Sequence, residues 1–544
     1  MFTVKVGAKE IRTDGTYLDA LKLAGAEDGA VAVRHGGETC ELGWSVIKDC
    51  EIEPLTLKTE EGRRVYERSL IFLLLMAVKD EYPHGKVEVE HSLTQGLYIL
   101  LRGIKFISNS VVQRIESRMR AIVEQDLPFE RNVVSVTEAI EIFRNLGQDD
   151  KVRLLNYRPK DFFRVYTCGN VSDYLYGEMV PSTGYLNVFA LSMHLPGIVL
   201  VMPSRENPQV ISRGLPSPKI AEVFAKSERW GEILDVQVVA DLNDMIKNGD
   251  IHEFVRVNEA LHEKTISKIA DEICEKHPRV VLIAGPSSSG KTTFTNRLNI
   301  QLRVNGLKPI LISLDNYYKH RDDVPIDENG DRDFEHLNAI DVQYFNEQLV
   351  SLLQGDRVRL PVFDFKIGQR RDSEYETELM DDQPILIEGI HGLNDDLTYD
   401  IPREFKYKIF VSALTQLNLD NTNRIRSTDL RLIRRLTRDY FTRSSTMENT
   451  MSMWTSVRKG EERWIFPFQE QADVIFNSSL TYELAVIKKY LYPLLEKVQP
   501  ESEHYLEVRR LVKFLNYFLD ADVEIDIPPT SILREFIGGN SFYT

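Results

Sequence analysis

The stretch Val281–Phe294, VLIAGPSSSGKTTF, decides the fold of the second half of this 544-residue chain. Apolar residues typical of a buried strand run into a glycine-bounded loop, and a lysine and two threonines follow. Residues 285–292 fit the pattern G-x-x-x-x-G-K-[ST], in which glycines let backbone N–H groups converge on phosphate oxygens. A helix that begins there points its positive end at the same anion. The sequence therefore predicts a nucleotide phosphate site between a strand and a helix.

Two residues at the end of this loop have specific expected roles. Lys291 brings positive charge to the outer phosphates, and Thr292 offers a hydroxyl to Mg²⁺. The alternative is a Gly/Ser-rich turn with a solvated lysine, and the preceding strand and following helix argue against it. The residues expected to bind the nucleotide are Gly285, Pro286, Ser287, Ser288, Ser289, Gly290, Lys291, Thr292 and Thr293.

Composition limits the class of protein. The apolar fraction is 42% and the charged fraction 28%, which is typical of globular domains. Four cysteines without a Cys-x-x-Cys spacing favour reduced thiols in a cytoplasm. The most apolar helical run, SLIFLLLMAV at 69–78, is too short to span a bilayer. We expect a cytoplasmic protein without a membrane span, and its net charge of −16 opposes binding to nucleic acid.

The pattern along the chain predicts five segments. Residues 1–60 alternate short β-like runs with one helix, as in an α+β module, and residues 61–240 begin with a core helix. A connecting helix is expected within 241–279 and a helical tail within 498–544. Between them, residues 280–497 alternate strands and helices. This alternation predicts an α/β domain with a parallel sheet flanked by helices.

Two acidic residues follow apolar strands of this α/β domain. Glu388 ends PILIE and could hold a metal-bound water, because ligands bind at the carboxyl edge of such a sheet. Asp315 ends ILISLD and could take a proton from an attacking hydroxyl. The alternatives are structural: Glu388 could cap the next loop, and Asp315 could form a turn.

A run of arginines, DLRLIRRLTRDYFTR, follows later in the domain. Spacings of three and four place Arg435 and Arg438 near one face of a helix, and Arg443 follows them. Arginines on a mobile helix can close over a transferring phosphoryl group and neutralise its charge. The other interpretation of a basic run is a solvated helix face.

These four elements in this order resemble the uridine kinase and phosphoribulokinase family of P-loop kinases over about 280–497. The resemblance implies ATP and Mg²⁺ as cofactors, with Thr292 and Glu388 as metal-side residues. Asp315 in LDNYYK matches the family's general base, and RRLTRD matches its lid helix. The implied catalytic residues are Asp315, Lys291, Arg435, Arg438 and Arg443.

The resemblance also implies a substrate side, formed by Tyr318, Glu335, Phe363 and Arg370. Glu335 in DFEHLNAID stands where the family's acid holds the ribose hydroxyls. The family's pyrimidine pocket uses a Tyr and a His, and the corresponding residues here are Phe363 and Gly368. Because buried donors and acceptors discriminate strongly between bases, the choice of base is open.

The N-terminal half resembles a second family, threonyl-tRNA synthetase. Residues 1–60 look like its TGS domain, and residues from 61 to about 200 resemble its editing domain. In that family a His-x-x-x-His pair and a later Cys-x-x-x-His serve editing or bind metal. None of these side chains is present here, since the matching positions are Arg68, Phe72, Leu175 and Met179. We therefore expect an editing-type fold without its chemistry.

Together these features predict an ATP-dependent kinase that phosphorylates the 5′-hydroxyl of a nucleoside. One alternative is a kinase for another small hydroxyl compound, as in phosphoribulokinase. Another is an RNA-binding regulatory protein whose P-loop acts as a switch. Residues 1–240 contain no long basic, aromatic-interleaved stretch, which counts against RNA, although the N-terminal half keeps a nucleic-acid partner open. The sequence leaves the oligomeric state, including a homo-oligomer, open.

Overall fold

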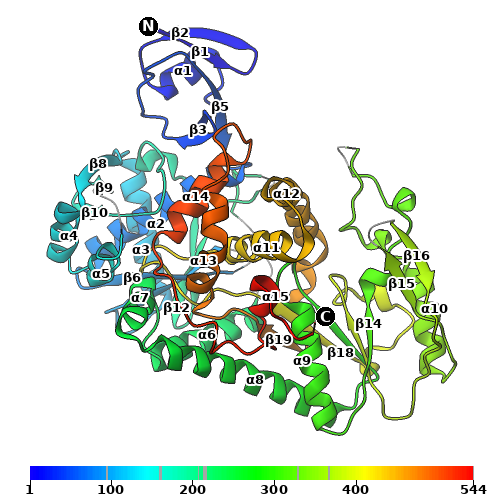
Figure 1. Cartoon of the computed structure of the whole chain (residues 1–544). Coiled ribbons are helices and arrows are strands. Elements are labelled where there is room, and N and C mark those ends of the chain that lie inside the picture. Colours follow the sequence, from blue (N-terminus) through cyan, green and yellow to red (C-terminus); the bar gives the residue numbers. More distant parts are fainter. Residues whose placement is uncertain are drawn as a thin grey trace.

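The computed structural model describes residues 1–93, 96–158, 162–205, 207–211, 217–327, 330–364 and 368–542. It confirms the predicted fold class, with α+β modules followed by an α/β domain (Figure 1). No helix within the described ranges is both long and apolar enough to cross a membrane.

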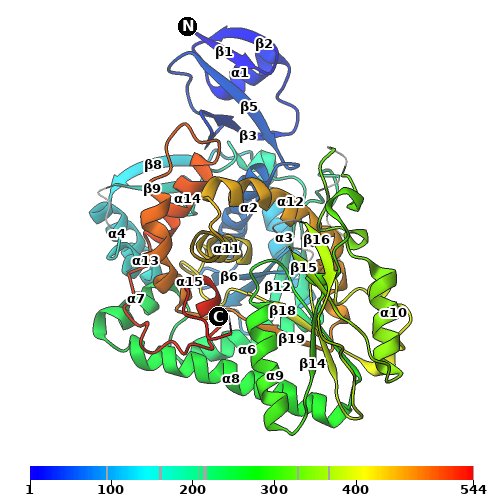
Figure 2. The same cartoon turned by 45° about the vertical axis from the view of Figure 1, so that its right-hand side comes forward.

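The N-terminal module is a five-stranded sheet of order β2-β1-β5-β3-β4 that stands at the top of Figures 1 and 2. Its helix α1 begins at a capping box in which Thr16 and Asp19 bond each other's backbone N–H groups, and it ends at Gly25 with φ +64°. The elements are β1 (Phe2–Val6), β2 (Lys9–Thr13), α1 (Tyr17–Ala24), β3 (Ala30–His35), β4 (Glu38–Cys40) and β5 (Cys50–Thr56).

The second module packs two antiparallel sheets around helix α2 (Glu60–Glu81), which is buried on most sides as its composition predicts. The sheet orders are β11-β12-β7-β6 and β10-β9-β8. The elements are β6 (Lys86–Leu93), β7 (Gly96–Arg102), α3 (Asn109–Glu124), β8 (Glu130–Ser135), α4 (Val136–Asn145), α5 (Asp149–Leu155), β9 (Phe162–Cys168), β10 (Val171–Asp173), β11 (Ala190–His194) and β12 (Gly197–Val201).

Three helices connect this module to the α/β domain: α6 (Pro218–Ile233), α7 (Val239–Asn248) and α8 (Ile251–Lys276). The segment 241–279, expected to contain one connecting helix, includes the end of α7 and all of α8. Gly249, with φ +88°, ends α7, because a left-handed residue cannot continue the helix. The long helix α8 then runs along the lower edge of the molecule to β13 (Figure 1).

The α/β domain contains a sheet of order β14-β17-β13-β18-β19 in which every strand pair is parallel. Its strands are β13 (Val280–Ala284), β14 (Ile310–Ser313), β17 (Ile385–Glu388), β18 (Lys406–Ser412) and β19 (Val474–Asn477), and the first three contain the apolar runs quoted from the sequence. β13 lies in the centre, so the phosphate loop that follows it opens at the middle of the sheet's carboxyl edge.

Helices and a hairpin surround this sheet. The hairpin β15 (Pro361–Asp364) and β16 (Gln369–Asp372) lies beside α10 at one side of the molecule (Figures 1 and 2). The helices are α9 (Lys291–Val304), α10 (Val342–Leu353), α11 (Ser427–Arg443), α12 (Met447–Trp464), α13 (Glu483–Leu495), α14 (Tyr505–Leu515) and α15 (Arg534–Ile537).

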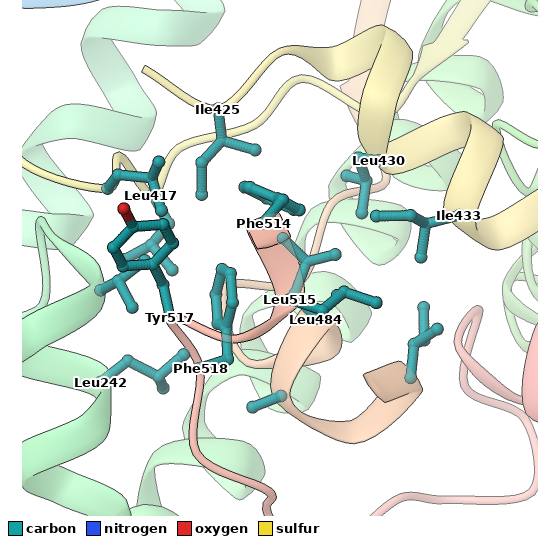
Figure 3. Packing of buried hydrophobic residues seen from close by; sticks show 14 of the residues in the cluster. Leu242, Leu417, Ile425, Leu430, Ile433, Leu484, Phe514, Leu515, Tyr517 and Phe518 are labelled. Carbon is teal, nitrogen blue, oxygen red and sulfur yellow. The ribbon is translucent and has the colours of Figure 1, made fainter. Parts of the chain in front are cut away.

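One hydrophobic core crosses the predicted segment boundaries. It joins Leu242 of α7, Ile433 of α11, Leu484 of α13 and Phe514 of α14 with residues of α4 and α5 (Figure 3). Burial of apolar area contributes about 25 cal/mol per Å², so a shared core of this kind holds its parts in a fixed relation. The N-terminal half and the α/β domain are therefore packed together.

Candidate functional site

The phosphate loop lies between β13 and α9, and two of its residues are glycines for steric reasons. A Cβ on Gly285 would lie 2.0 Å from the carbonyl oxygen of Val411, and Gly290 has φ +84°. Ser288 also has a positive φ of +58°, an unusual backbone conformation for a serine. Backbone of this kind turns successive N–H groups inward and forms an anion-binding concavity.

The inside of the loop is polar and unsatisfied. The hydroxyls of Ser288 and Ser289 are buried and have no hydrogen-bond partner within the described part of the chain. Lys291 Nζ donates to the carbonyl oxygen of Pro286 at 3.3 Å. Buried polar groups in native proteins are almost always paired, so these atoms fit a ligand rich in acceptor oxygens. The loop is thus shaped and polarised for a nucleotide's phosphates.

Thr292 and Glu388 meet at the carboxyl edge of the sheet, as the sequence predicts for a metal-side pair. The Thr292 hydroxyl lies 3.3 Å from both carboxylate oxygens of Glu388, and Ser313 Oγ lies 3.4 Å from one of them. Burial raises the pKa of Glu388 to about 7, although Lys291 opposes the shift. A hydroxyl and a carboxylate are ligands that Mg²⁺ accepts beside phosphate oxygens and water, so this pair fits the ion.

Asp315 lies close to the phosphate loop, on a short 3₁₀ turn directly after β14. Part of Asp315 is exposed to solvent. The protein around its carboxyl group still removes enough water to raise the pKa of Asp315. The cations Lys291 and Arg443 lower the same pKa in part. A carboxylate with a raised pKa beside a phosphate-binding lysine is suited to accept a proton from a hydroxyl.

The predicted arginines lie on α11 (Ser427–Arg443), most of which is buried. Residues 429–439 of α11 are buried, because the helix is part of the shared core. Arg435 donates to Ser287 Oγ at 2.8 Å, and Arg438 donates to Asp439 at 2.8 Å. Only the last turn is open, where the Arg443 side chain is 61% exposed and lies 3.9 Å from Asp439. Arg435 and Arg438 are thus bonded to neighbouring residues, whereas the Arg443 side chain is mostly exposed.

Tyr318 and Glu335 form the inner part of the predicted substrate side. The Tyr318 hydroxyl donates to the carbonyl oxygen of Phe334 at 3.2 Å. Burial raises the pKa of Glu335 to about 7, and the nearby Glu461 adds to this shift while Arg435 opposes it. The charge of Asp315 also raises the pKa of Glu335, so the structure places this carboxyl near the predicted base.

Phe363 and Arg370 lie at the outer part of this side, on the β15–β16 hairpin. The ring centroids of Phe363 and Tyr318 are 6.0 Å apart. Arg370 donates to Asp341 at 3.1 Å and lines a small cavity of about 350 Å³ together with Tyr318. Gly368 has φ +66°, so a larger residue there would be strained. The hairpin therefore offers an aromatic face and a cation.

Sequence reasoning missed two residues that hold the phosphate loop. Glu461 of α12 accepts a hydrogen bond from the backbone N–H of Ser287 at 2.9 Å, and Arg431 donates to the carbonyl oxygen of the same residue at 3.1 Å. Arg431 and Glu461 also pair with each other while fully buried. Arg431 stands in the quoted basic run, but no sequence signal singles out Glu461.

The C-terminal tail also reaches the loop. Thr293 donates to Glu535 at 2.7 Å and accepts from Asn540 at 3.1 Å, so its hydroxyl is engaged with the tail. Only the backbone N–H of Thr293 is left for the predicted nucleotide contact. Ile532 packs against Gly290, where a Cβ would lie 2.6 Å from its methyl group. Tail packing thus supports the start of α9.

In the N-terminal half, the four positions that match the editing residues are filled by packing. Phe72, Leu175 and Met179 are buried in the core around α2. Arg68 donates to the carbonyl oxygen of Glu178 at 2.7 Å. These are apolar and cationic side chains, which are not the usual ligands of a zinc ion.

Comparison with known proteins agrees with this division of the chain. Residues 280–485 match the model of the "Phosphoribulokinase / Uridine kinase family", and they form a domain of that family. The N-terminal region matches threonine--tRNA ligases. The ligase of Marinobacter nauticus is 31% identical over 170 residues, which cover 31% of this chain and 26% of the ligase. The chain thus spans about a quarter of the length of that relative.

Two solved structures are similar to parts of the chain. One is described as a "Possible Uridine Kinase" from Bacillus stearothermophilus, with 22% identity, a TM-score of 0.24, and coverage of 37% of this chain and 89% of that one. The other is the D-glycerate 3-kinase from Cryptococcus neoformans, with 15% identity, a TM-score of 0.22, and coverage of 46% and 87%. The family match identifies residues 280–485 as a domain of the phosphoribulokinase and uridine kinase family, in which the phosphate loop stands at the start.

Proposed function

We propose that the protein is an ATP-dependent kinase that transfers the γ-phosphoryl group of ATP to the 5′-hydroxyl of a nucleoside. The observation that carries this proposal is the phosphate loop, in which the buried Ser288 and Ser289 hydroxyls have no partner among the described residues, with Asp315 directly after the neighbouring strand β14. A cytoplasmic location agrees with the proposal, because ATP is the phosphoryl donor there.

The chain's own residues account for the transfer. Asp315 takes the proton of the acceptor hydroxyl while that oxygen bonds to the γ-phosphorus and the bond to the β-phosphate oxygen breaks, releasing ADP. Lys291 and Arg435 stand at the loop, and Arg443 is free to approach; their charge stabilises the phosphoryl group in transit. Mg²⁺, held by Thr292 and Glu388, would neutralise phosphate charge when bound.

A nucleoside acceptor is supported by the substrate side of the cleft. Glu335 offers a half-buried carboxylate to ribose hydroxyls, and the Tyr318 and Phe363 rings offer faces for a base. Gly368 provides no side chain to read the base edge, and its positive φ disfavours one. This observation favours a second candidate, a kinase for another small hydroxyl compound such as a sugar phosphate.

The test is ADP release with ATP and Mg²⁺ against uridine, cytidine, adenosine, guanosine, inosine, thymidine, ribulose 5-phosphate and pantothenate. Asp315→Asn should lower turnover by about 10²–10⁴-fold. The exposed Asp400→Asn is the matched control and should leave turnover unchanged. Turnover of a nucleoside that depends on Asp315 supports the proposal. Turnover of only a non-nucleoside would favour the second candidate, and none above the Asp315→Asn level would overturn both.

A further inference from the structure

A large cavity lies between the N-terminal half and the α/β domain, and none of its lining residues belongs to the phosphate loop. Its volume is about 1540 Å³, and its walls come from the first module, the second module, the loop before α11, α12 and α14. Small-molecule sites in proteins usually measure about 300–1,000 Å³. The cavity can therefore hold a metabolite of nucleotide size with its hydration water.

The charge of this interdomain cavity is opposite to that of the chain. Fifteen lining residues are Lys or Arg and nine are Asp or Glu, a surplus of six positive charges. The whole chain carries −16. Such a concentration of one sign in a cleft focuses the field and raises the local concentration of an oppositely charged ligand. The cavity selects for an anion.

Three of these cations have no carboxylate partner in the described part of the chain. Among the described residues no carboxylate lies within 4.0 Å of the guanidinium groups of Arg131, Arg158 or Arg509. Arg158 Nη1 is also buried without a hydrogen-bond acceptor in the described part of the chain, whereas Arg64 and Arg424 pair with Glu507 and Glu67. Guanidinium groups bind phosphate with two parallel hydrogen bonds, so these arginines match a phosphate group well.

The same cavity has an apolar side. Phe162 is 66% exposed and Val133 59% exposed, and both line it. Trp44 lies beside them, with the Arg131 guanidinium 4.1 Å from its ring centroid. An exposed phenyl ring and a stacked guanidinium offer flat surfaces to an aromatic base. A nucleotide can use both features, with its phosphate on the cations and its base against the aromatic rings.

We propose that the interdomain cavity is a second ligand site, which binds a free nucleotide through Arg131 and Arg158 with its base against Phe162. Two helices connect this site to the phosphate loop. On α12, Arg458 lines the cavity and pairs with Glu461, the residue that accepts from Ser287 N–H. On α11, Asp429 lines the cavity and Arg431 holds Ser287. Occupancy of the cavity can thus change the loop's affinity for ATP.

The binding test uses the full chain with Lys291→Ala, which weakens nucleotide binding at the phosphate loop. AMP, GMP, CMP, UMP and inorganic phosphate are titrated by calorimetry, and so is a single-stranded RNA hexamer. We expect one nucleotide to bind with 1:1 stoichiometry. Adding Arg131→Gln and Arg158→Gln should weaken it at least about tenfold, since two charge-assisted contacts are lost. Arg144→Gln, an exposed arginine of α4 outside the cavity, is the matched control and should change nothing.

Phe162→Ala tests the site independently of whether the arginine variants fold. Its exposed side chain can be removed without opening a core. It should weaken the nucleotide but leave inorganic phosphate unchanged. No binding of any nucleotide, or equal binding by the protein with and without the two arginine substitutions, would overturn the proposal. So would binding of the RNA hexamer alone, which would make the cavity an RNA site. None of these readouts depends on turnover, so they are separate from the test of the kinase proposal.

The connection to the loop has its own measurement. In the protein with Lys291 intact, the bound nucleotide should shift the affinity for a non-hydrolysable ATP analogue at least about threefold, a modest coupling energy. By thermodynamic reciprocity the analogue should shift the nucleotide's affinity by the same factor. Arg131→Gln with Arg158→Gln should abolish the shift. An unchanged affinity for the analogue with the cavity occupied would overturn the connection.

Discussion

The backbone N–H of Ser287 donates to the carboxylate of Glu461 at 2.9 Å, across 174 positions of sequence. Glu461 is fully buried and is paired with Arg431 and Arg458. Burial alone would favour the neutral form of this carboxyl, but the two arginines outweigh it and lower the pKa of Glu461. The first part of the phosphate loop is therefore held by a charged side chain from α12, and Glu461 is a positioning residue for that loop.

Replacement of this carboxylate should destabilise the protein and loosen the loop. Glu461→Ala leaves Arg431 as a buried charge without its partner, and breaking such a pair costs about 3–5 kcal/mol. We expect the free energy of unfolding to fall by this amount in urea denaturation. In the folded protein at low temperature, the affinity for a non-hydrolysable ATP analogue should also fall.

The neighbouring Glu462→Gln is the matched control for this prediction. Glu462 pairs with Arg205 and Arg458, but its side chain is 40% exposed, and surface ion pairs contribute about 0–1 kcal/mol. Equal stability losses for the two variants would show that the loop gains nothing from Glu461.

Magnesium-dependent binding of the ATP analogue should depend on pH near neutrality. The pKa of Glu388 is raised to about 7, and a protonated carboxyl must lose its proton before it can hold Mg²⁺. Below pH 7 the affinity should therefore fall by up to about tenfold per pH unit, and it should level off above pH 8. Calorimetry from pH 5.5 to 8.5 would measure this.

Two variants distinguish the groups that titrate there. Glu388→Gln should bind the metal complex weakly with a flat pH profile, whereas Glu335→Gln should keep the slope, although the pKa of Glu335 is also about 7. Without ligand, the stability of the folded protein changes with pH in the opposite direction to the affinity for the metal complex. The folded pKa of Glu388 exceeds the unfolded value of 4.5, so the folded state binds the extra proton, and its stability declines as pH rises from about 4.5 to 7. A metal-binding slope retained in Glu388→Gln would contradict the assignment.

A buried ionic triad should stabilise the packing of the N-terminal half against the α/β domain. Lys151 Nζ lies 3.0 Å from Asp173 and 3.1 Å from Asp420, and all three side chains are almost inaccessible. Lys151→Met would leave two buried carboxylates without their cation, at a cost of about 3–5 kcal/mol in the free energy of unfolding. Lys226→Met, at an exposed pair on α6, should change it by less than about 0.5 kcal/mol. Similar denaturation midpoints for both variants would refute a structural role of the triad.

Gly285 should tolerate no side chain. An added Cβ would lie 2.0 Å from the Val411 carbonyl oxygen, so β13 and β18 would have to separate at the loop. Gly285→Ala should lower the melting temperature, since overpacking of this kind costs about 1–3 kcal/mol, and it should remove measurable binding of the ATP analogue. Gly43→Ala is the control, because a Cβ there meets nothing within 4 Å. Analogue binding by Gly285→Ala at the level of the Gly43→Ala protein would show that the loop does not need this close approach.

Much of the candidate site follows from local sequence patterns. The glycines and Lys291 stand in one continuous motif, and Asp315 and Glu388 each end an apolar strand, so their shared edge of the sheet is predictable. Glu461 and Glu535 carry no such signal, because each reaches the loop from a distant helix through packing. The burial of α11 also carries no local signal, because it depends on packing against α13 and α15.

The sequence by itself determined the order of strands and helices in the α/β domain and the position of the phosphate loop. These are local properties, set by hydrophobic period, by glycine positions and by residue identity. Only the tertiary structure decided that one core joins both halves, that Glu461 and Arg431 hold Ser287, and that cations from several modules gather around one cavity. Such features depend on contacts between residues hundreds of positions apart, and the periodicity of a segment carries no information about its distant partner.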